Sequence, residues 1–176
     1  LWDLSNGRCI RRFETWLAER HALEQTGMYD EWEEETGYTL ETYPGHMYPL
    51  NCLELSQDLR WAITGSSDQT LRLWDVSSGR VLRVLKGHQD AVTDVALTAD
   101  CQYALSTSLD STLRLWKLDT GRCLRILTGH EGDVNSICLS QDGSYALSGS
   151  SDLTLRYWKI PEGTCLSVLE GHHDTV

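Results

Sequence analysis

The sequence predicts an all-β fold built from repeated units, and three observations carry this prediction. Gly-His dipeptides recur every 42 residues, beginning at Gly45, Gly87, Gly129 and Gly171. A Trp closes a Thr-Leu-Arg-x-Trp run once in each interval. Between these landmarks lie short segments rich in Val, Leu, Ile and Thr, separated by clusters of Asp, Gly and Ser. A fixed period in this range indicates that each unit buries its apolar surface against copies of itself.

Each repeat contains four predicted strands, which are clearest in the middle repeat. There they cover residues 92–97, 103–107, 112–118 and 123–127. Short leucine-rich and β-branched runs bounded by turn residues favour antiparallel strands, and no run keeps helical periodicity beyond one turn. Four strands in a unit of this length are typical of a β-propeller blade.

The repeats divide the chain into a half blade, an insertion, three blades and the start of a further repeat. A closed ring needs about 4–8 blades, so we expect an incomplete ring that the remaining blades of a longer chain would close. The units are residues 1–13 (end of a third strand and a fourth strand), 14–44 (insertion), 45–86, 87–128 and 129–170 (blades) and 171–176 (start of a further repeat).

Several motif elements recur together in fixed phase. Each repeat carries Gly-His, then a turn Asp, then a Trp six residues later, followed by Asp75 or by Lys117 and Lys159. The first four residues, Leu-Trp-Asp-Leu, match the tail of another repeat. On these elements the chain resembles the WD-repeat family of β-propellers, although the two Lys depart from the second letter of the family motif. The resemblance implies recognition of proteins or peptides.

A His, a Ser or Thr, an Asp and a Trp share the same phase in each repeat. Ser, His and Asp together could indicate a hydrolase triad. A catalytic site is needed once, however, and this set appears three times with an indole donor added, so we predict no catalytic residues. The resemblance implies a hydrogen-bond chain inside each blade, and the donors and acceptors of these side chains are mutually compatible. The sets are His46, Thr64, Asp68 and Trp74; His88, Ser106, Asp110 and Trp116; and His130, Ser148, Asp152 and Trp158.

Basic residues recur on the predicted fourth strand, which is the outer edge of its blade. Two interpretations remain open. Exposed charge there discourages edge-to-edge aggregation, or the side chains form a phosphate-binding rim. The residues are Arg8, Arg80 and Arg122 and, three positions later, Arg11, Arg83 and Arg125.

Composition excludes several classes of function. The net charge of −11 argues against non-specific binding to nucleic acid or to an anionic membrane, since both require a cationic surface. No apolar run approaches the roughly 18 residues of a membrane span. We predict no metal site and no cofactor, because neither zinc-ligand spacing nor a Gly-rich phosphate loop occurs. The six Cys include no C-x-x-C pair, so we predict reduced thiols in a cytoplasmic protein.

The repeat is interrupted once, between Trp2 and His46. These residues are 44 positions apart, whereas the other Trp-to-His intervals are 14. The extra residues hold eight acidic side chains, one basic side chain and five aromatic ones. We predict a short helix over residues 15–25 and a segment that projects over the top face of the propeller. Three interpretations remain open: a solvated loop, a recognition element for a basic or aromatic-accepting partner, and a packed cap or sequence artefact.

We expect a non-catalytic scaffold that recognises a protein or peptide through the top face. The alternative is a regulatory segment of a multidomain signalling enzyme, a kinase or an NTPase, whose catalytic domain lies outside this chain. Leu109 and Leu153 either are exposed apolar contacts or pack on neighbouring loops. The predicted contacts are Trp16, Tyr29 and Trp32 in the insertion, and Tyr48, Ser67, Gln69, Gln89, Asp90, Leu109, Glu131, Ser151 and Leu153 in the loops.

Overall fold

The computed structural model describes residues 2–3, 8–9 and 45–176. The chain divides into two units, Leu1–Pro49 and Leu50–Val176. In the first unit, β1 (Trp2–Asp3) and β2 (Arg8–Cys9) pair antiparallel. The predicted insertion over residues 14–44, with its predicted helix, lies outside the described residues.

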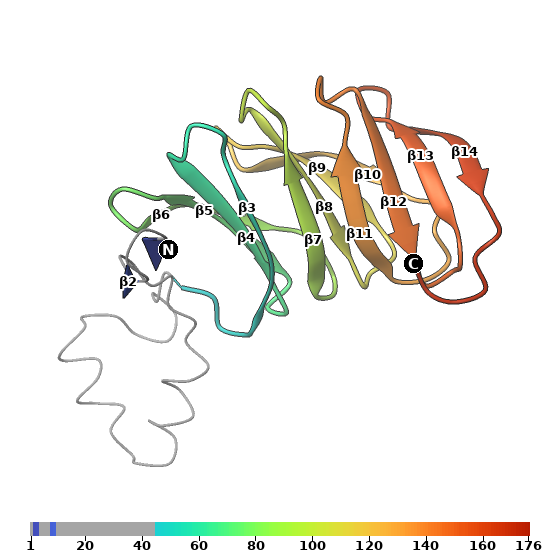
Figure 1. The fold of residues 1–176 in the computed structure, drawn as a ribbon, viewed down its shortest axis with the longest axis horizontal. Helices are drawn as coiled ribbons and strands as arrows, with labels where there is room; N and C mark the ends of the chain where they lie inside the picture. The colour runs from blue at the N-terminus through green and yellow to red at the C-terminus, as the bar shows by residue number, and fades with distance from the viewer. Residues whose placement is uncertain (1, 4–7, 10–44) are drawn as a thin grey trace, which may run out of the picture. The chain divides into compact units, whose positions relative to one another are not determined.

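The second unit consists of three four-stranded antiparallel sheets, which follow one another from cyan to red in Figure 1. Each sheet is a meander of consecutive strands, so the predicted all-β class with four-stranded blades is confirmed. The strands of the middle repeat begin and end within one residue of their predicted bounds. The first blade holds β3 (Leu50–Leu55), β4 (Trp61–Ser66), β5 (Thr70–Asp75) and β6 (Arg80–Lys86); the second holds β7 (Val92–Leu97), β8 (Tyr103–Ser108), β9 (Leu113–Lys117) and β10 (Arg122–Leu127); the third holds β11 (Val134–Leu139), β12 (Tyr145–Ser150), β13 (Leu155–Lys159) and β14 (Thr164–Leu169).

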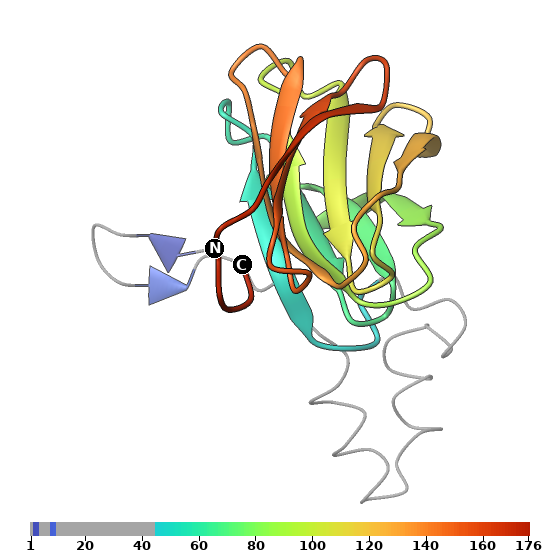
Figure 2. The same ribbon diagram turned by 90° about the vertical axis from the view of Figure 1, so that its right-hand side faces the viewer.

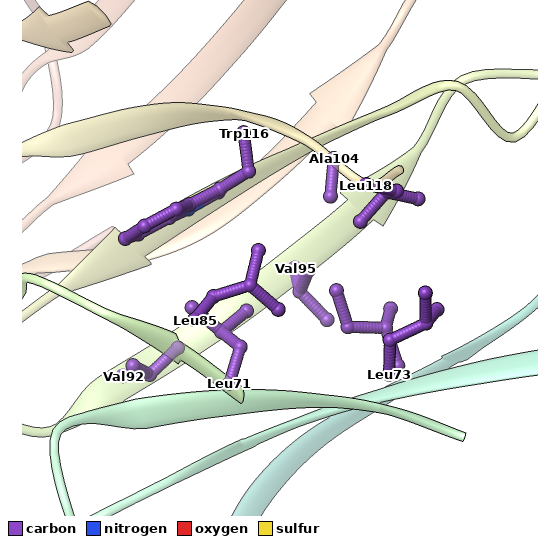
Figure 3. Close-up of a cluster of buried hydrophobic side chains, with 9 residues drawn as sticks. Leu71, Leu73, Leu85, Val92, Val95, Ala104, Trp116 and Leu118 are labelled. Atoms are coloured by element: carbon purple, nitrogen blue, oxygen red, sulfur yellow. The ribbon is translucent and has the colours of Figure 1, made fainter. Parts of the chain in front are cut away.

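The second blade is buried on both faces because a blade packs on either side of it. Successive side chains of a strand point to opposite faces. Ala104 and Trp116 therefore join the core shared with the first blade, whereas Leu105 and Leu115 join the core shared with the third. Figure 3 shows the first of these cores, where the Trp116 indole lies over side chains of β5 and β6. Complete burial of a leucine of this kind contributes about 1.5–3 kcal/mol to folding.

The strands β3, β7 and β11 form the inner row of the three blades, in which β7 contacts β3 on one side and β11 on the other. Each one carries a β-bulge near its first residue, which leaves Asn51, Thr93 and Asn135 without a partner in the sheet register. A bulge can redirect a side chain, and here it directs these side chains to the next repeat. They donate to the carbonyl oxygens of Val92, Val134 and Val176 at 2.8, 2.5 and 2.7 Å.

The outer strands β6 and β10 are tied to the following blade by their arginines. Arg83 Nε donates to the Asp119 carbonyl oxygen at 3.3 Å, and Arg125 Nε donates to the Pro161 carbonyl oxygen at 2.9 Å. The structure thus gives these two side chains a structural contact in addition to the two roles considered from the sequence. Figure 2 views the same blades from the end of the third sheet. No further described sheet covers that end, and Leu169 is 46% exposed where its counterpart Leu127 is buried.

Candidate functional site

Antiparallel meanders place two sets of loops at opposite ends of the blades. The top face, as used here, holds the turns between second and third strands and the connections between blades. The bottom face holds the other hairpin turns. The top face comprises residues 67–69, 87–91, 109–112, 128–133 and 151–154; the bottom face comprises residues 56–60, 76–79, 98–102, 118–121, 140–144 and 160–163.

A continuous hydrogen-bond chain fixes the top face of the second blade. Trp116 Nε1 donates to Ser106 Oγ at 2.8 Å, and Ser106 Oγ lies 2.8 Å from His88 Nε2. His88 Nδ1 lies 2.8 Å from Asp110 Oδ2. The Asp110 carboxylate also accepts from the backbone N–H groups of Gln89 and Thr112. The chain therefore runs from the blade interior to two separate top-face loops.

The third blade repeats this geometry almost unchanged. Trp158 Nε1 donates to Ser148 Oγ at 2.9 Å, Ser148 Oγ lies 2.7 Å from His130 Nε2, and His130 Nδ1 lies 2.7 Å from Asp152 Oδ2. Asp152 also accepts from the Glu131 backbone N–H at 3.1 Å. The two blades thus hold equivalent loops in equivalent positions.

The first blade shows the inner part of the same arrangement. Trp74 Nε1 donates to Thr64 Oγ1 at 2.8 Å. Asp68 Oδ1 accepts from the Thr70 backbone N–H and hydroxyl, and Asp68 also lies 3.9 Å from Arg72. His46 is buried and belongs to the N-terminal unit.

The imidazoles of His88 and His130 are neutral at pH 7. Burial lowers the pKa of His88 and of His130 below the ordinary value, and it outweighs the neighbouring Asp110 and Asp152 carboxylates, which act in the opposite direction. Burial alone would raise the pKa of Asp110, but hydrogen bonds from Thr112, Gln89 and His88 lower it instead. A neutral imidazole between an ionised carboxylate and a hydroxyl must carry its proton on Nδ1 and accept on Nε2. Each hydroxyl then donates to His and accepts from Trp, so every member is satisfied.

In two of the Gly-His dipeptides, the Gly lies against an arginine side chain. A Cβ on Gly87 would lie 2.8 Å from Arg114 Nη1 and 3.2 Å from the Trp116 ring. A Cβ on Gly129 would lie 2.7 Å from Arg156 Nη1. The arginines also disfavour a charged imidazole beside them. In the second and third blades, the Arg that precedes the Trp therefore packs over the dipeptide that begins the repeat.

The Ser-His-Asp sets are placed for structure rather than for nucleophilic chemistry. Ser106 and Ser148 are fully buried, and each already bonds to an indole and an imidazole. Among the residues that the structure describes, no three His, Cys, Asp or Glu side chains gather in a way that could hold a metal ion. The described part of the chain has no helix long and apolar enough to cross a membrane.

The predicted contact residues are unequally exposed on the top face. Leu109 and Leu153 are 36% and 40% exposed, and Gln69, Gln89, Asp90 and Glu131 are also exposed. Leu153 adopts a φ of 67°, a conformation that leucine seldom takes. Ser67 and Ser151 are half-buried and bond to Asn51 and Asn135. Tyr48 is exposed in the N-terminal unit, and Trp16, Tyr29 and Trp32 lie outside the described residues.

Asn51, Thr93 and Asn135 link consecutive blades, and they are not among the residues predicted from the sequence. Their signal was present, because all three share one phase of the 42-residue repeat. Because two of these side chains are amides and one is a hydroxyl, the shared position is not obvious from the residue types.

Cys52, Cys101, Cys123, Cys138 and Cys165 are free thiols. Burial raises the pKa of Cys52 to about 12, with a contribution from Asp94. Cys138 and Cys165 are exposed.

Comparisons with known proteins agree with this architecture. The family model "WD domain, G-beta repeat" matches residues 37–75, 79–117 and 121–159. Two similar solved structures are those of U3-55K and of the RRP9 WD40 repeats, each 26% identical with a TM-score of 0.72. Each match covers 75% of this chain and 42% of the solved chain, so this chain spans less than half of their length. No curated protein matches the sequence.

Proposed function

Because this chain belongs to the WD40-repeat family, whose propellers are generally protein-interaction scaffolds, we propose that its top face binds a protein or peptide partner. One observation carries the proposal. Two hydrogen-bond chains anchored on buried Trp tie the top-face loops to the blades, and Leu109 and Leu153 lie in those loops with 36% and 40% of their surface exposed. Rigid loops with exposed apolar side chains favour binding, since little ordering is needed when the partner docks.

The polar surroundings define the partner further. Asp90 and Glu131 are exposed on the connections between blades, and the Ala91 carbonyl, next to Asp90, accepts from the Leu109 backbone N–H. An apolar pair with acidic neighbours favours a partner segment that combines apolar and basic residues. The acidic aromatic insertion, with Trp16, Tyr29 and Trp32, belongs to this proposal on its composition alone. The free thiols and the acidic charge support a cytoplasmic scaffold with no nucleic-acid or membrane ligand.

The test compares partner capture by three forms of the protein. Leu109→Ser with Leu153→Ser removes the apolar pair from the top face. Leu59→Ser is the matched control, because Leu59 is also exposed and also has a positive φ, but lies on the bottom face. We expect the double variant to lose partners that the control retains. Identical partner lists for the two would contradict the proposal.

A second comparison addresses the insertion. Deleting residues 15–44, or changing Trp32 to Ala and residues 33–35 to Lys, should weaken partner binding without lowering the melting temperature. Unchanged binding would show that the insertion is not a recognition element and would leave the loops as the binding surface.

A further inference from the structure

A pocket of about 720 Å³ opens between the second and third blades on the bottom face. Its volume falls within the roughly 300–1,000 Å³ of typical ligand pockets. The turns 98–102 and 140–144 contribute polar side chains, and both blades contribute an apolar wall. The wall residues are Tyr103, Leu115, Leu124, Leu139, Ile160 and Pro161.

The pocket is a local departure from the repeat. The equivalent groove between the first and second blades has a volume of about 450 Å³. Ser144 and Tyr103 stand in the larger pocket at the positions that Gln102 and Trp61 occupy in the smaller groove. Both replacements are smaller side chains, so the pocket is larger where the repeated sequence varies. Blade packing alone does not require this variation, because the groove beside it accommodates the larger residues.

Two carboxylates give the pocket its electrostatic character. Asp142 Oδ1 accepts from Ser140 Oγ at 2.6 Å, and Asp100 Oδ1 accepts from Thr98 Oγ1 at 2.6 Å. These bonds lower the pKa of both carboxyls, which are therefore ionised at neutral pH. Neither forms an ion pair with a cation in the described part of the chain.

One cation, Arg125, also lines the pocket, and the wall positions it. Its Nε donates to the Pro161 carbonyl oxygen at 2.9 Å, which ties the guanidinium to the third blade. The lining therefore carries two ionised carboxylates and one arginine. An apolar wall with this excess of negative charge is complementary to a ligand that is apolar and cationic.

From this combination we infer that the bottom-face pocket binds a short peptide segment of a partner protein, in which an apolar side chain stands next to Lys or Arg. The apolar side chain lies against the wall around Tyr103 and Leu115, and the cation lies near Asp100 and Asp142. The site is on the opposite face from the top-face surface and does not depend on it.

Synthetic peptides test this inference directly on the full-length protein. Three capped heptapeptides are compared by fluorescence anisotropy: one with a central Phe flanked by Lys, one with Phe flanked by Glu, and one with Ala flanked by Lys. We expect saturable binding of the first peptide, about tenfold tighter than of either control, which corresponds to loss of one well-placed contact. Absence of saturable binding, or equal binding of the Glu-flanked peptide, would overturn the inference.

Pocket variants locate the binding. Ser144→Gln introduces the residue that the preceding blade already accommodates, so it fills the pocket with the fold retained and should weaken binding about tenfold. Asp100→Asn and Asp142→Asn keep the Oδ1 acceptor of each turn and should each weaken binding about two- to fivefold.

The control for both is Asp58→Asn, which changes the same turn position in the first blade, outside the pocket. It should leave affinity unchanged, as should the top-face double variant of Leu109 and Leu153. Circular dichroism of each variant establishes that the fold is intact. Equal affinity of the Ser144→Gln and Asp58→Asn proteins would overturn the inference, whatever the outcome for the top face.

Discussion

The Thr93 hydroxyl donates to the carbonyl oxygen of Val134, 41 residues ahead in the next blade, at 2.5 Å. The same hydroxyl lies 2.8 Å from Thr107 Oγ1 within its own blade. One side chain therefore couples a β-bulge to the neighbouring inner strand. Asn51 and Asn135 make the equivalent contact with an amide.

Thr93→Val should destabilise the protein while conserving side-chain shape. The Val134 carbonyl and the Thr107 hydroxyl lose a partner in a part-buried place, which costs about 1–3 kcal/mol. Urea unfolding measures the change. Thr120→Val, on an exposed turn, is the matched control and should be close to neutral; equal midpoints for the two variants would contradict this role.

Ser106→Ala should be more damaging than its small change in volume suggests. It leaves the Trp116 indole N–H and His88 Nε2 without partners in a fully buried place. We expect a loss of about 2–4 kcal/mol in the free energy of unfolding, since two buried groups are left unpaired. Ser111→Ala, on the adjacent turn, serves as the control. If the Ser106→Ala and Ser111→Ala proteins melt at the same temperature, the hydrogen-bond chain does not stabilise the fold.

Stability should fall as the pH is lowered below about 6.5, where an unperturbed imidazole begins to take up a proton. Burial lowers the pKa of His88 and His130 in the folded state, so the unfolded chain takes up protons first. Their contribution is complete above pH 6.5 and is lost as the pH falls toward the folded-state pKa. Urea midpoints at pH 7.5 and 5.5 measure this. The variant with both His88→Gln and His130→Gln should show a flatter profile, and parallel profiles would contradict the assignment.

Arg125→Ala should lower stability by about 0.5–1.5 kcal/mol, the contribution of one hydrogen bond, because Arg125 ties β10 to the third blade. Arg122→Ala removes an exposed arginine three residues earlier on the same strand and should be nearly neutral. The pair also tests the rim hypothesis. If these arginines form a phosphate-binding rim, both variants should bind inorganic phosphate more weakly. If Arg125 is only a structural tie, Arg125→Ala should lose stability and neither variant should change in phosphate binding.

Thiol reactivity should follow burial. The pKa of Cys52 is raised to about 12, so its thiolate is scarce at pH 8. Iodoacetamide labelling followed by mass spectrometry should modify the exposed Cys138 and Cys165 at least tenfold faster. Comparable rates for Cys52 under native conditions would show that this strand opens readily.

The strands and blades were predictable because their signals are local. Runs rich in Val, Leu, Ile and Thr between turn residues predicted the bounds of β7 as observed, and those of β8, β9 and β10 to within one residue. The contacts between blades were not predictable in the same way. The donor role of Thr93 depends on a carbonyl 41 residues away, and the bulge that directs it is invisible in the residue pattern.

The bottom pocket shows a second limit of sequence reasoning. Its depth arises from the combined sizes of Tyr103 and Ser144, which lie in different blades. Neither residue is unusual by itself. The repeat register shows that each is smaller than its counterpart, but only the packing of one blade against the next shows that both line the same pocket.

The inner-strand hydrogen bonds have an evolutionary consequence. Every donor reaches a carbonyl that lies 41 residues ahead, so the donor and the acceptor of consecutive units are always in register. A tandem duplication of one 42-residue unit would produce a blade whose donor and acceptor already match those of both neighbouring blades. Such a gene could therefore lengthen or shorten by whole blades without redesign of any junction.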